Sequence, residues 1–324
     1  MKLKNDCSRP IGRSSRKGVV MITHTDSSVR EDTRGAPTLR AVADLTERIG
    51  NLFASPSYQP PVLPSVAVEL LDVARYPDID LKRIAQLIAR DPMLAGQVMR
   101  RVQSPFYAGR VPIHDLNQAI FRLGLINIRD IVLEAALNMR VFTTPHYVQA
   151  MERVRRHSVA TAHIGKLLAP VTQQDPHQLF LLGLLHDIGI AAAIITIDEM
   201  FENQERPAIN HIWPAIETIH ESAGTLVARI WDLPPELANV IGGHHHYQTA
   251  GGNNPLVATL HIAEAIARRL DRGITPPGRP AYYASTVDVT PPEVVASARR
   301  QLNLSQSELM DVVRAAEERL DAVG

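Results

Sequence analysis

Apolar residues recur at three- and four-residue spacing along most of the chain from Leu63 onwards. In the first such segment the apolar positions are Val66, Leu70, Leu71 and Ala74, which share one face of a helix. The spacing predicts helices over residues 63–74, 81–88, 92–102, 116–142, 147–168, 178–200, 211–230, 235–245 and 255–270. No alternating strand of useful length and no internal repeat accompanies them, so the sequence predicts an all-α fold.

Local signals mark where several of these helices begin and end. Asp91 followed by Pro92 is typical of an N-cap with proline at the first helical position. Asp115 is a second N-cap, and Gly124 predicts a break in the apolar stretch that follows it. Two capping boxes predict the starts of late helices, at Thr290 with Glu293 and at Ser305 with Glu308.

Composition shifts divide the chain into four parts. We expect a disordered, mildly basic tail (1–36), a short helix with a Pro-rich linker (37–62), an N-terminal helical lobe (63–145) and a second helical lobe with C-terminal helices (146–324). Pro145 closes the first lobe. The sequence leaves Met1 and Met21 open as the start.

The most hydrophobic segment, residues 179–197, carries the ionisable pair His186-Asp187 near its middle. Three interpretations are open: a membrane span, a core helix with an incidental polar pair, or a metal site. About 20 apolar residues cross a bilayer, but an Asp at mid-helix costs roughly 2.5–3.5 kcal/mol on insertion scales. We therefore predict buried core, in which the pair needs partners. Gly189 predicts that the segment is two pieces, broken near Ile188-Gly189.

Overall composition narrows the class of protein. Lys+Arg and Asp+Glu balance at 34 each, so no global charge draws the chain to nucleic acid or to a membrane. The single cysteine, Cys7, excludes an internal disulfide framework and fits a reducing compartment. The N-terminal residues lack the apolar core of a secretory signal, so the expected location is the cytoplasm.

Histidines interrupt several apolar helix faces of the second predicted lobe. With two acidic residues they come from five helical segments, which a bundle can bring to one point: His157, His186, Asp187, His220, His244, His245 and Glu264. Histidine and carboxylate together suit Fe, Mn, Zn or Co. A single histidine on an apolar face is more often a hydrogen-bonded core residue, whereas the whole series favours a metal site.

The order of these residues resembles the HD superfamily of metal-dependent phosphohydrolases. His157, then His186-Asp187, then a terminal carboxylate follow its motif, with Glu264 where that motif has Asp. The resemblance implies that these four side chains hold one ion, with Asp187 bridging. The remaining three resemble the additional ligands of the two-metal HD-GYP phosphodiesterases and would hold a second ion: His220, His244 and His245.

The first lobe is similar to the N-terminal lobe of the HDOD family, the HD-related output domain. The similarity is carried by LPSVAVELLDVARYPDIDLKRIAQLIARDPMLAGQVMRRVQSPFYAG, by IHDLNQAIFRLGLINIRDIVL and by WDLP at residues 231–234. It covers roughly residues 63–270. Members are regulatory modules of bacterial signal transduction, often without catalytic residues. The resemblance implies a regulator that binds a signalling protein or a small ligand such as a nucleotide.

Three departures from the HD-GYP pattern weigh against catalysis. Glu264 adds a methylene where ligand distances are tight to within about 0.2 Å. Ile190 stands where active HD-GYP enzymes carry a lysine, and the GYP motif is absent. Three interpretations stay open: a metal- or ligand-binding regulator, a metal-dependent phosphohydrolase with Asp187 as its catalytic ligand, and a relic whose histidines only hydrogen-bond. We expect little or no hydrolysis of cyclic-di-GMP.

The segment LKRIAQLIARDPMLAGQVMRRV superficially suggests a helix-turn-helix, with Arg100 and Arg101 on its second helix. Its turn is Asp-Pro rather than the glycine type, and both helices are apolar enough to pack inside a bundle. DNA binding is therefore not expected.

Overall fold

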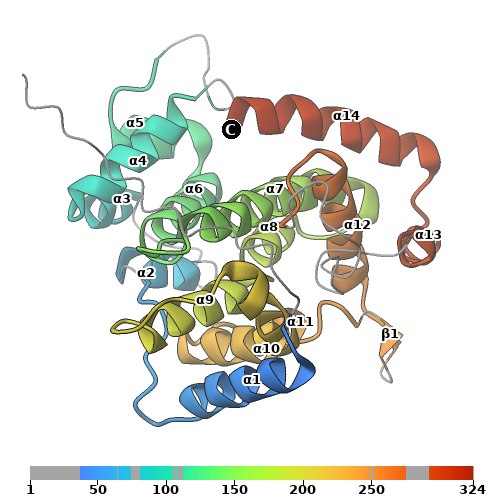
Figure 1. Ribbon diagram of the computed structural model, residues 1–324. Helices are drawn as coiled ribbons and strands as arrows, with labels where there is room; N and C mark the ends of the chain where they lie inside the picture. Colours follow the sequence, from blue (N-terminus) through green and yellow to red (C-terminus); the bar gives the residue numbers. More distant parts are fainter. Residues whose placement is uncertain are drawn as a thin grey trace, which may run out of the picture.

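The helices of the chain surround one long central helix, α7 (Val148–Thr172) (Figure 1). The computed structural model describes residues 37–63, 65–73, 81–104, 107, 112–246, 248–249, 252–274 and 292–323. Before α7 come α1 (Leu39–Phe53), α2 (Ser65–Val73), α3 (Leu81–Ala89), α4 (Pro92–Val102), α5 (Leu116–Leu123) and α6 (Leu125–Arg140). After it come α8 (Pro176–Leu185), α9 (Ile188–Met200), α10 (Ile209–Ile230), α11 (Pro235–Ile241), α12 (Pro255–Arg269), α13 (Pro292–Gln301) and α14 (Gln306–Val323). A two-residue antiparallel pair, β1 (Gln248–Thr249) and β2 (Gly252–Asn253), is the only strand structure described. The predicted all-α fold is confirmed.

The predicted helix boundaries of the first half are set by local capping. The Asp91 side chain accepts hydrogen bonds from the backbone N–H groups of Met93 and Leu94, and α4 begins at Pro92. Asp115 caps α5 in the same way, and Gly124, with φ at +77°, separates α5 from α6. A φ in this region is strained for any residue with a Cβ, so the glycine fixes the break.

The later capping signals have different outcomes. At α14 the Ser305 hydroxyl accepts from the Glu308 N–H at 3.2 Å, and the Glu308 carboxylate accepts from the Ser305 N–H at 2.9 Å. The predicted capping box is therefore confirmed. Thr290, and with it the other predicted box, lies outside the described residues, as does the predicted tail of residues 1–36.

Two clusters of buried apolar side chains stabilise the bundle. The larger one extends from Ile49 in α1 to Ile274 and includes side chains on both sides of the predicted lobe boundary at 145/146, which stays a prediction. The smaller one joins one face of α7 to α12, α13 and α14. The segment predicted as a short helix and linker packs against the bundle as well. Ile49 and Phe53 are buried, and the Trp231 indole N–H donates to the Pro61 carbonyl at 3.0 Å.

A buried carboxylate in α6 joins that helix to α7 and α8. Asp130, 1 % exposed, lies 2.7 Å from Lys166 Nζ in α7 and 2.8 Å from His177 Nδ1 in α8. The guanidinium of Arg129 lies 2.9 Å from the same carboxylate. A carboxylate this buried is stable only with such partners, so the ion pairs fix how α6 sits against α7 and α8.

A second buried ion pair links α4 to α6 and α7. Arg101 and Glu134 lie 2.6 Å apart, and His163 Nε2 lies 3.2 Å from Glu134. The Arg101 side chain therefore forms an internal ion pair and is largely buried. This agrees with the expectation that α3 and α4 pack inside a bundle.

The apolar segment that carries His186-Asp187 is broken into two helices, as predicted, but at the pair itself. α8 ends at Leu185 and α9 begins at Ile188. Pro176–Met200 is long and apolar enough to cross a membrane, yet 94 % of its most apolar window is buried inside the protein. This burial supports the core interpretation.

Gly189 lies inside α9 and does not break the helix. A Cβ at this position would lie 1.9 Å from the His220 carbonyl oxygen and 2.6 Å from the Gly224 nitrogen in α10. Gly183 lies equally close to the backbone of α7, since a Cβ added at Gly183 would lie 2.5 Å from the Ala162 nitrogen. The two glycines therefore let backbones touch on both sides of the His186-Asp187 junction.

Candidate metal centre

Five helical segments bring the seven predicted residues to one place. His157 comes from the middle of α7, His186 and Asp187 from the α8–α9 junction, and His220 from α10. The turn after α11 supplies His244 and His245, and α12 supplies Glu264. Six of the seven are at most 3 % exposed: His157, His186, Asp187, His220, His244 and Glu264.

The orientation of four rings is fixed by backbone carbonyls. His186, His220 and His244 each direct Nδ1 to the carbonyl three residues earlier, at 2.9, 2.7 and 2.7 Å. His157 Nδ1 lies 2.9 Å from the carbonyl of Arg272. A carbonyl only accepts, so the proton sits on Nδ1 and donates. Each Nε2 then faces the centre of the cluster, where it can bind a metal ion once it is deprotonated.

The donor atoms form two groups that share Asp187. One group holds His157, His186 and Asp187, and the other holds Asp187, His220, His244 and His245; within each group the donor atoms lie within 4.8 Å of one another. Glu264 adjoins the first group, with Oε1 at 3.7 Å from His186 Nε2. The arrangement therefore matches the assignment of two ions bridged by Asp187 that the HD-GYP resemblance implies, and whether ions bind stays a prediction.

The distances between the candidate ligand atoms are those expected around a metal ion. His157 Nε2 and His186 Nε2 lie 3.3 Å apart, and His220 Nε2 and His245 Nε2 lie 3.0 Å apart. The Asp187 oxygens lie 3.0 Å from His186 Nε2 and 3.3 Å from His244 Nε2. Two ligands about 2.1 Å from one ion, at angles between right and tetrahedral, lie roughly 3.0–3.4 Å apart. The separations are those of neighbouring ligands.

Several polar atoms of the cluster lack hydrogen bonds. Asp187 Oδ1, His244 Nε2 and Glu264 Oε1 are buried and form none within the described residues. An unsatisfied buried polar atom costs about 1–3 kcal/mol, so three in one cluster need a common explanation. A divalent cation satisfies all of them.

Charges inside the cluster separate the pKa values of its members. Burial and the neighbouring His244 lower the pKa of His220 to about 4. Burial lowers the pKa of His244, but the effect of the Asp187 carboxylate is larger and raises the pKa of His244 to about 9. Burial alone would raise the pKa of Asp187, yet His186 and His244 hold it well below its usual range. These charges favour the anionic form of Asp187, and a divalent ion would compete with protons for the rings beside it.

Two residues at the edge of the cluster were not predicted. His261 is buried in α12, one helical turn before Glu264, and its ring centroid lies 6.5 Å from that of His245. The three-residue spacing of His261 and Glu264 was visible in the sequence and would have put both on one face. Glu221 accepts from the His245 backbone N–H at 3.2 Å and supports the turn after α11.

Comparison with known proteins shows which family shares this fold. The HDOD domain family model matches residues 61–247, which include all the cluster residues except Glu264. The chain belongs to the HDOD domain family. A "Putative metal-dependent phosphohydrolase" from Shewanella amazonensis is 20 % identical, with a TM-score of 0.66 over 88 % of this chain and 99 % of its own. An HDOD domain protein of unknown function from Geobacter sulfurreducens is also 20 % identical, with a TM-score of 0.60 over 89 % of this chain and 99 % of its own.

Two further relatives of this HDOD protein differ from it in length. A "Putative signal transduction protein" from Marinobacter aquaeolei is 18 % identical, with a TM-score of 0.60 over 92 % of this chain and 66 % of its own. An uncharacterised protein of Treponema pallidum is 25 % identical over 249 residues, 74 % of this chain. The match spans 46 % of the Treponema protein. Identities at this level show a shared fold.

Proposed function

We propose that this HDOD protein is a regulator of bacterial signal transduction in the cytoplasm, built around a divalent metal centre. The centre would hold its helices in one arrangement, which a signalling protein then recognises. The observation that carries the proposal is the cluster of carbonyl-oriented histidines facing Asp187. The names of the Shewanella and Marinobacter proteins fit the metal and the signalling parts of this proposal respectively.

The burial of the ligands favours a regulator over an enzyme. Structural metal sites are closed by protein ligands, whereas catalytic sites keep a position open to substrate. Here His245 alone among the seven is partly exposed. Ile190, at the position of the lysine in active HD-GYP enzymes, is fully buried in the larger apolar cluster. This position therefore offers no cation to a phosphate.

Metal-dependent phosphohydrolase activity is the second candidate, because the ligands of two sites are retained. Asp187 would then be the shared ligand, and His157, His186 and Glu264 would complete the first site. Bound ions would supply Lewis acidity and lower the pKa of water. The side chains would hold the ions and exclude bulk water, and His245 marks the side from which substrate could enter.

Metal content of matched variants tests the centre. The chain is expressed with Fe, Mn or Zn, desalted and measured by elemental analysis, and about two ions per chain are expected from the two ligand groups. His157→Ala should lose the first ion and His220→Ala the second, while Asp187→Ala should lose both. His114→Ala, an exposed histidine far from the cluster in sequence, should retain both. A wild-type chain that takes up no ion from any of the three metals would refute the proposal.

The same preparations separate regulator from enzyme. Loaded wild-type protein is assayed on cyclic-di-GMP, nucleotides and an aryl phosphodiester. We expect metal uptake without turnover on cyclic-di-GMP. Robust hydrolysis that disappears in Asp187→Ala would replace the regulator by the phosphohydrolase.

A further inference from the structure

A cavity of about 990 Å³ lies between α4, α6 and α7. It is separate from the residues of the metal cluster, none of which lines it. Small-molecule sites in proteins span roughly 300–1,000 Å³, so the cavity is large enough for a ligand the size of a nucleotide.

Arginines dominate the charge of this cavity. Five line it against two carboxylates, Glu134 and Glu152, which leaves three positive charges in excess: Arg100, Arg101, Arg155, Arg156 and Arg272. Both carboxylates are already used, Glu134 by Arg101 and Glu152 by a bidentate pair with Arg155. The overall chain is neutral, so this excess is a local feature of the cavity.

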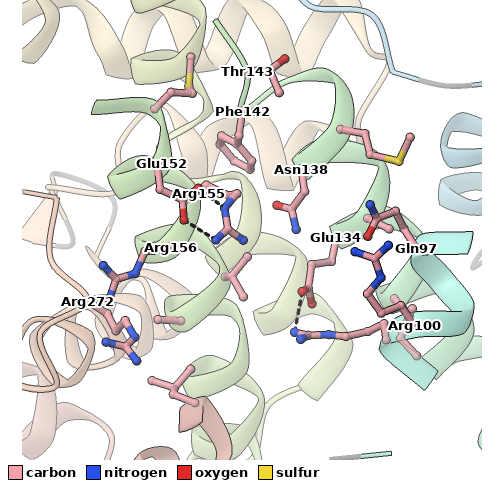
Figure 2. Close-up of a pocket in the computed structure, with 18 of the residues that line it drawn as sticks. Gln97, Arg100, Glu134, Asn138, Phe142, Thr143, Glu152, Arg155, Arg156 and Arg272 are labelled. Atoms are coloured by element: carbon pink, nitrogen blue, oxygen red, sulfur yellow. Dashed lines mark hydrogen bonds and ion pairs between the residues drawn. The ribbon is translucent and has the colours of Figure 1, made fainter. Parts of the chain in front are cut away.

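The two exposed arginines are available to a ligand. Arg100 and Arg156 form no hydrogen bond or ion pair with any described residue. Figure 2 shows Arg156 beside Arg272 on one side of the cavity and Arg100 on the other. A guanidinium presents a planar fork of donors that matches phosphate, so anionic groups can be held at either side.

The interior between the arginines suits the rest of a nucleotide. Its wall is apolar where Ile131, Phe142 and Met151 line it, which favours a flat organic group over a bare inorganic ion. Asn138 Oδ1 and Ser104 Oγ are buried there without a hydrogen-bond partner among the described residues. Buried polar atoms are nearly always satisfied, and an amide that both donates and accepts can pair with the edge of a base.

We propose that the cavity between α4, α6 and α7 binds a purine nucleotide, with Arg156 and Arg272 on its phosphates, Asn138 on its base, and Arg100 adding positive charge from the opposite side. The cavity adjoins the metal centre at His157. The carbonyl of Arg272 accepts from His157 Nδ1, and Arg156 directly precedes His157 in α7. Nucleotide binding does not depend on the metal, so the proposal is independent of the proposed function.

Fluorescence anisotropy with ribose-labelled ADP and GDP tests the site. The full chain is titrated in EDTA, which removes ions that could hold a nucleotide at the metal centre. We expect saturable binding that weakens at least tenfold in the Arg100→Ala/Arg156→Ala double variant, a loss of the size that charged hydrogen bonds to phosphate provide. Both side chains are exposed, and unchanged thermal melting verifies that the double variant is folded.

Matched controls define the alternatives. Arg40→Ala, an exposed arginine of α1, should bind as the wild type does. Absence of saturable binding to the wild type, or full affinity in the double arginine variant, would overturn the proposal. Saturable binding that appears only when EDTA is replaced by a divalent metal would move the nucleotide to the metal cluster. Equal competition by inorganic pyrophosphate would reduce the site to an anion site, and equal competition by adenosine would contradict the role of the arginines.

Discussion

Replacing Gly189 by alanine tests whether close contact of α9 and α10 builds the metal centre. The new methyl carbon would lie 1.9 Å from the His220 carbonyl oxygen. Carbon and oxygen approach to about 3.3 Å in close contacts, so the two helices must separate by about 1.4 Å. Both neighbours are backbone atoms of a packed helix and cannot rotate away, as the end of a side chain could.

The expected cost follows from this overlap. Overpacking a core typically costs 1–3 kcal/mol, and contact with backbone places Gly189→Ala near the upper value, about 3 kcal/mol. For a chain of this size that corresponds to a decrease in Tm of about 5 °C. The same separation moves His220 relative to Asp187, and a shift of this size far exceeds the roughly 0.2 Å tolerance of metal ligands. The variant should therefore also lose the ion held by His220.

Two measurements check this prediction, thermal melting and metal content per chain. Gly96→Ala is the matched control, because a Cβ at Gly96 in α4 meets no atom within 4 Å. It should leave metal content unchanged and keep or raise Tm, since alanine favours the helix by up to about 1 kcal/mol. If Gly189→Ala melts and binds metal as the wild type does, the helices are not in backbone contact and the reasoning fails.

Two predictions concern the buried carboxylate that joins α6 to α7 and α8. Asp130→Ala leaves the Lys166 and Arg129 charges without their carboxylate and should destabilise the chain by about 3–5 kcal/mol in urea unfolding. Asp311→Ala, which removes only an exposed pair with Arg314, should cost at most about 1 kcal/mol. Similar losses in both variants would contradict the burial of Asp130. Burial raises the pKa of Asp130, but the opposite effect of His177, Lys166 and Arg129 is larger. The pKa of Asp130 is therefore lowered below 3.8. The stabilisation is therefore present above the ordinary carboxyl pKa and lost as the pH falls through the lowered value. Unfolding measured between about pH 3 and pH 5 should show a weaker acid destabilisation in Asp130→Asn than in the wild type, and identical slopes would argue against the lowered pKa.

Sequence signals predicted the parts of the fold that depend on neighbouring residues. The Asp91 cap, the Gly124 break and the Ser305–Glu308 capping box depend on atoms within one helical turn, and all three are observed. The break near Gly189 was predicted from helix propensity, but the glycine serves contact with a helix about 30 residues later in the chain. Tertiary contact overrode propensity at that position.

The chemistry of the chain was predictable only where the sequence carried an ordered motif. The histidine series could be read in order, and its members do lie together. The arginine-lined cavity could not be read in the same way, because Arg100, Arg156 and Arg272 come from distant segments of a chain with balanced charge. Arg101, beside Arg100, is paired internally with Glu134. Adjacent positions on a helix point in different directions, so sequence alone could not separate their roles.

The carbonyl contacts of the cluster histidines would make the proposed metal centre preorganised. Three of the rings are held by carbonyls of their own segments, three residues earlier, so their orientation does not depend on an ion. In zinc fingers, by contrast, metal binding supplies the folding free energy and the apo chain is unfolded. Here the helices can fold first and receive the ion afterwards. Loss of metal should then change the charge and rigidity of a folded protein, which is the behaviour a reversible sensor requires.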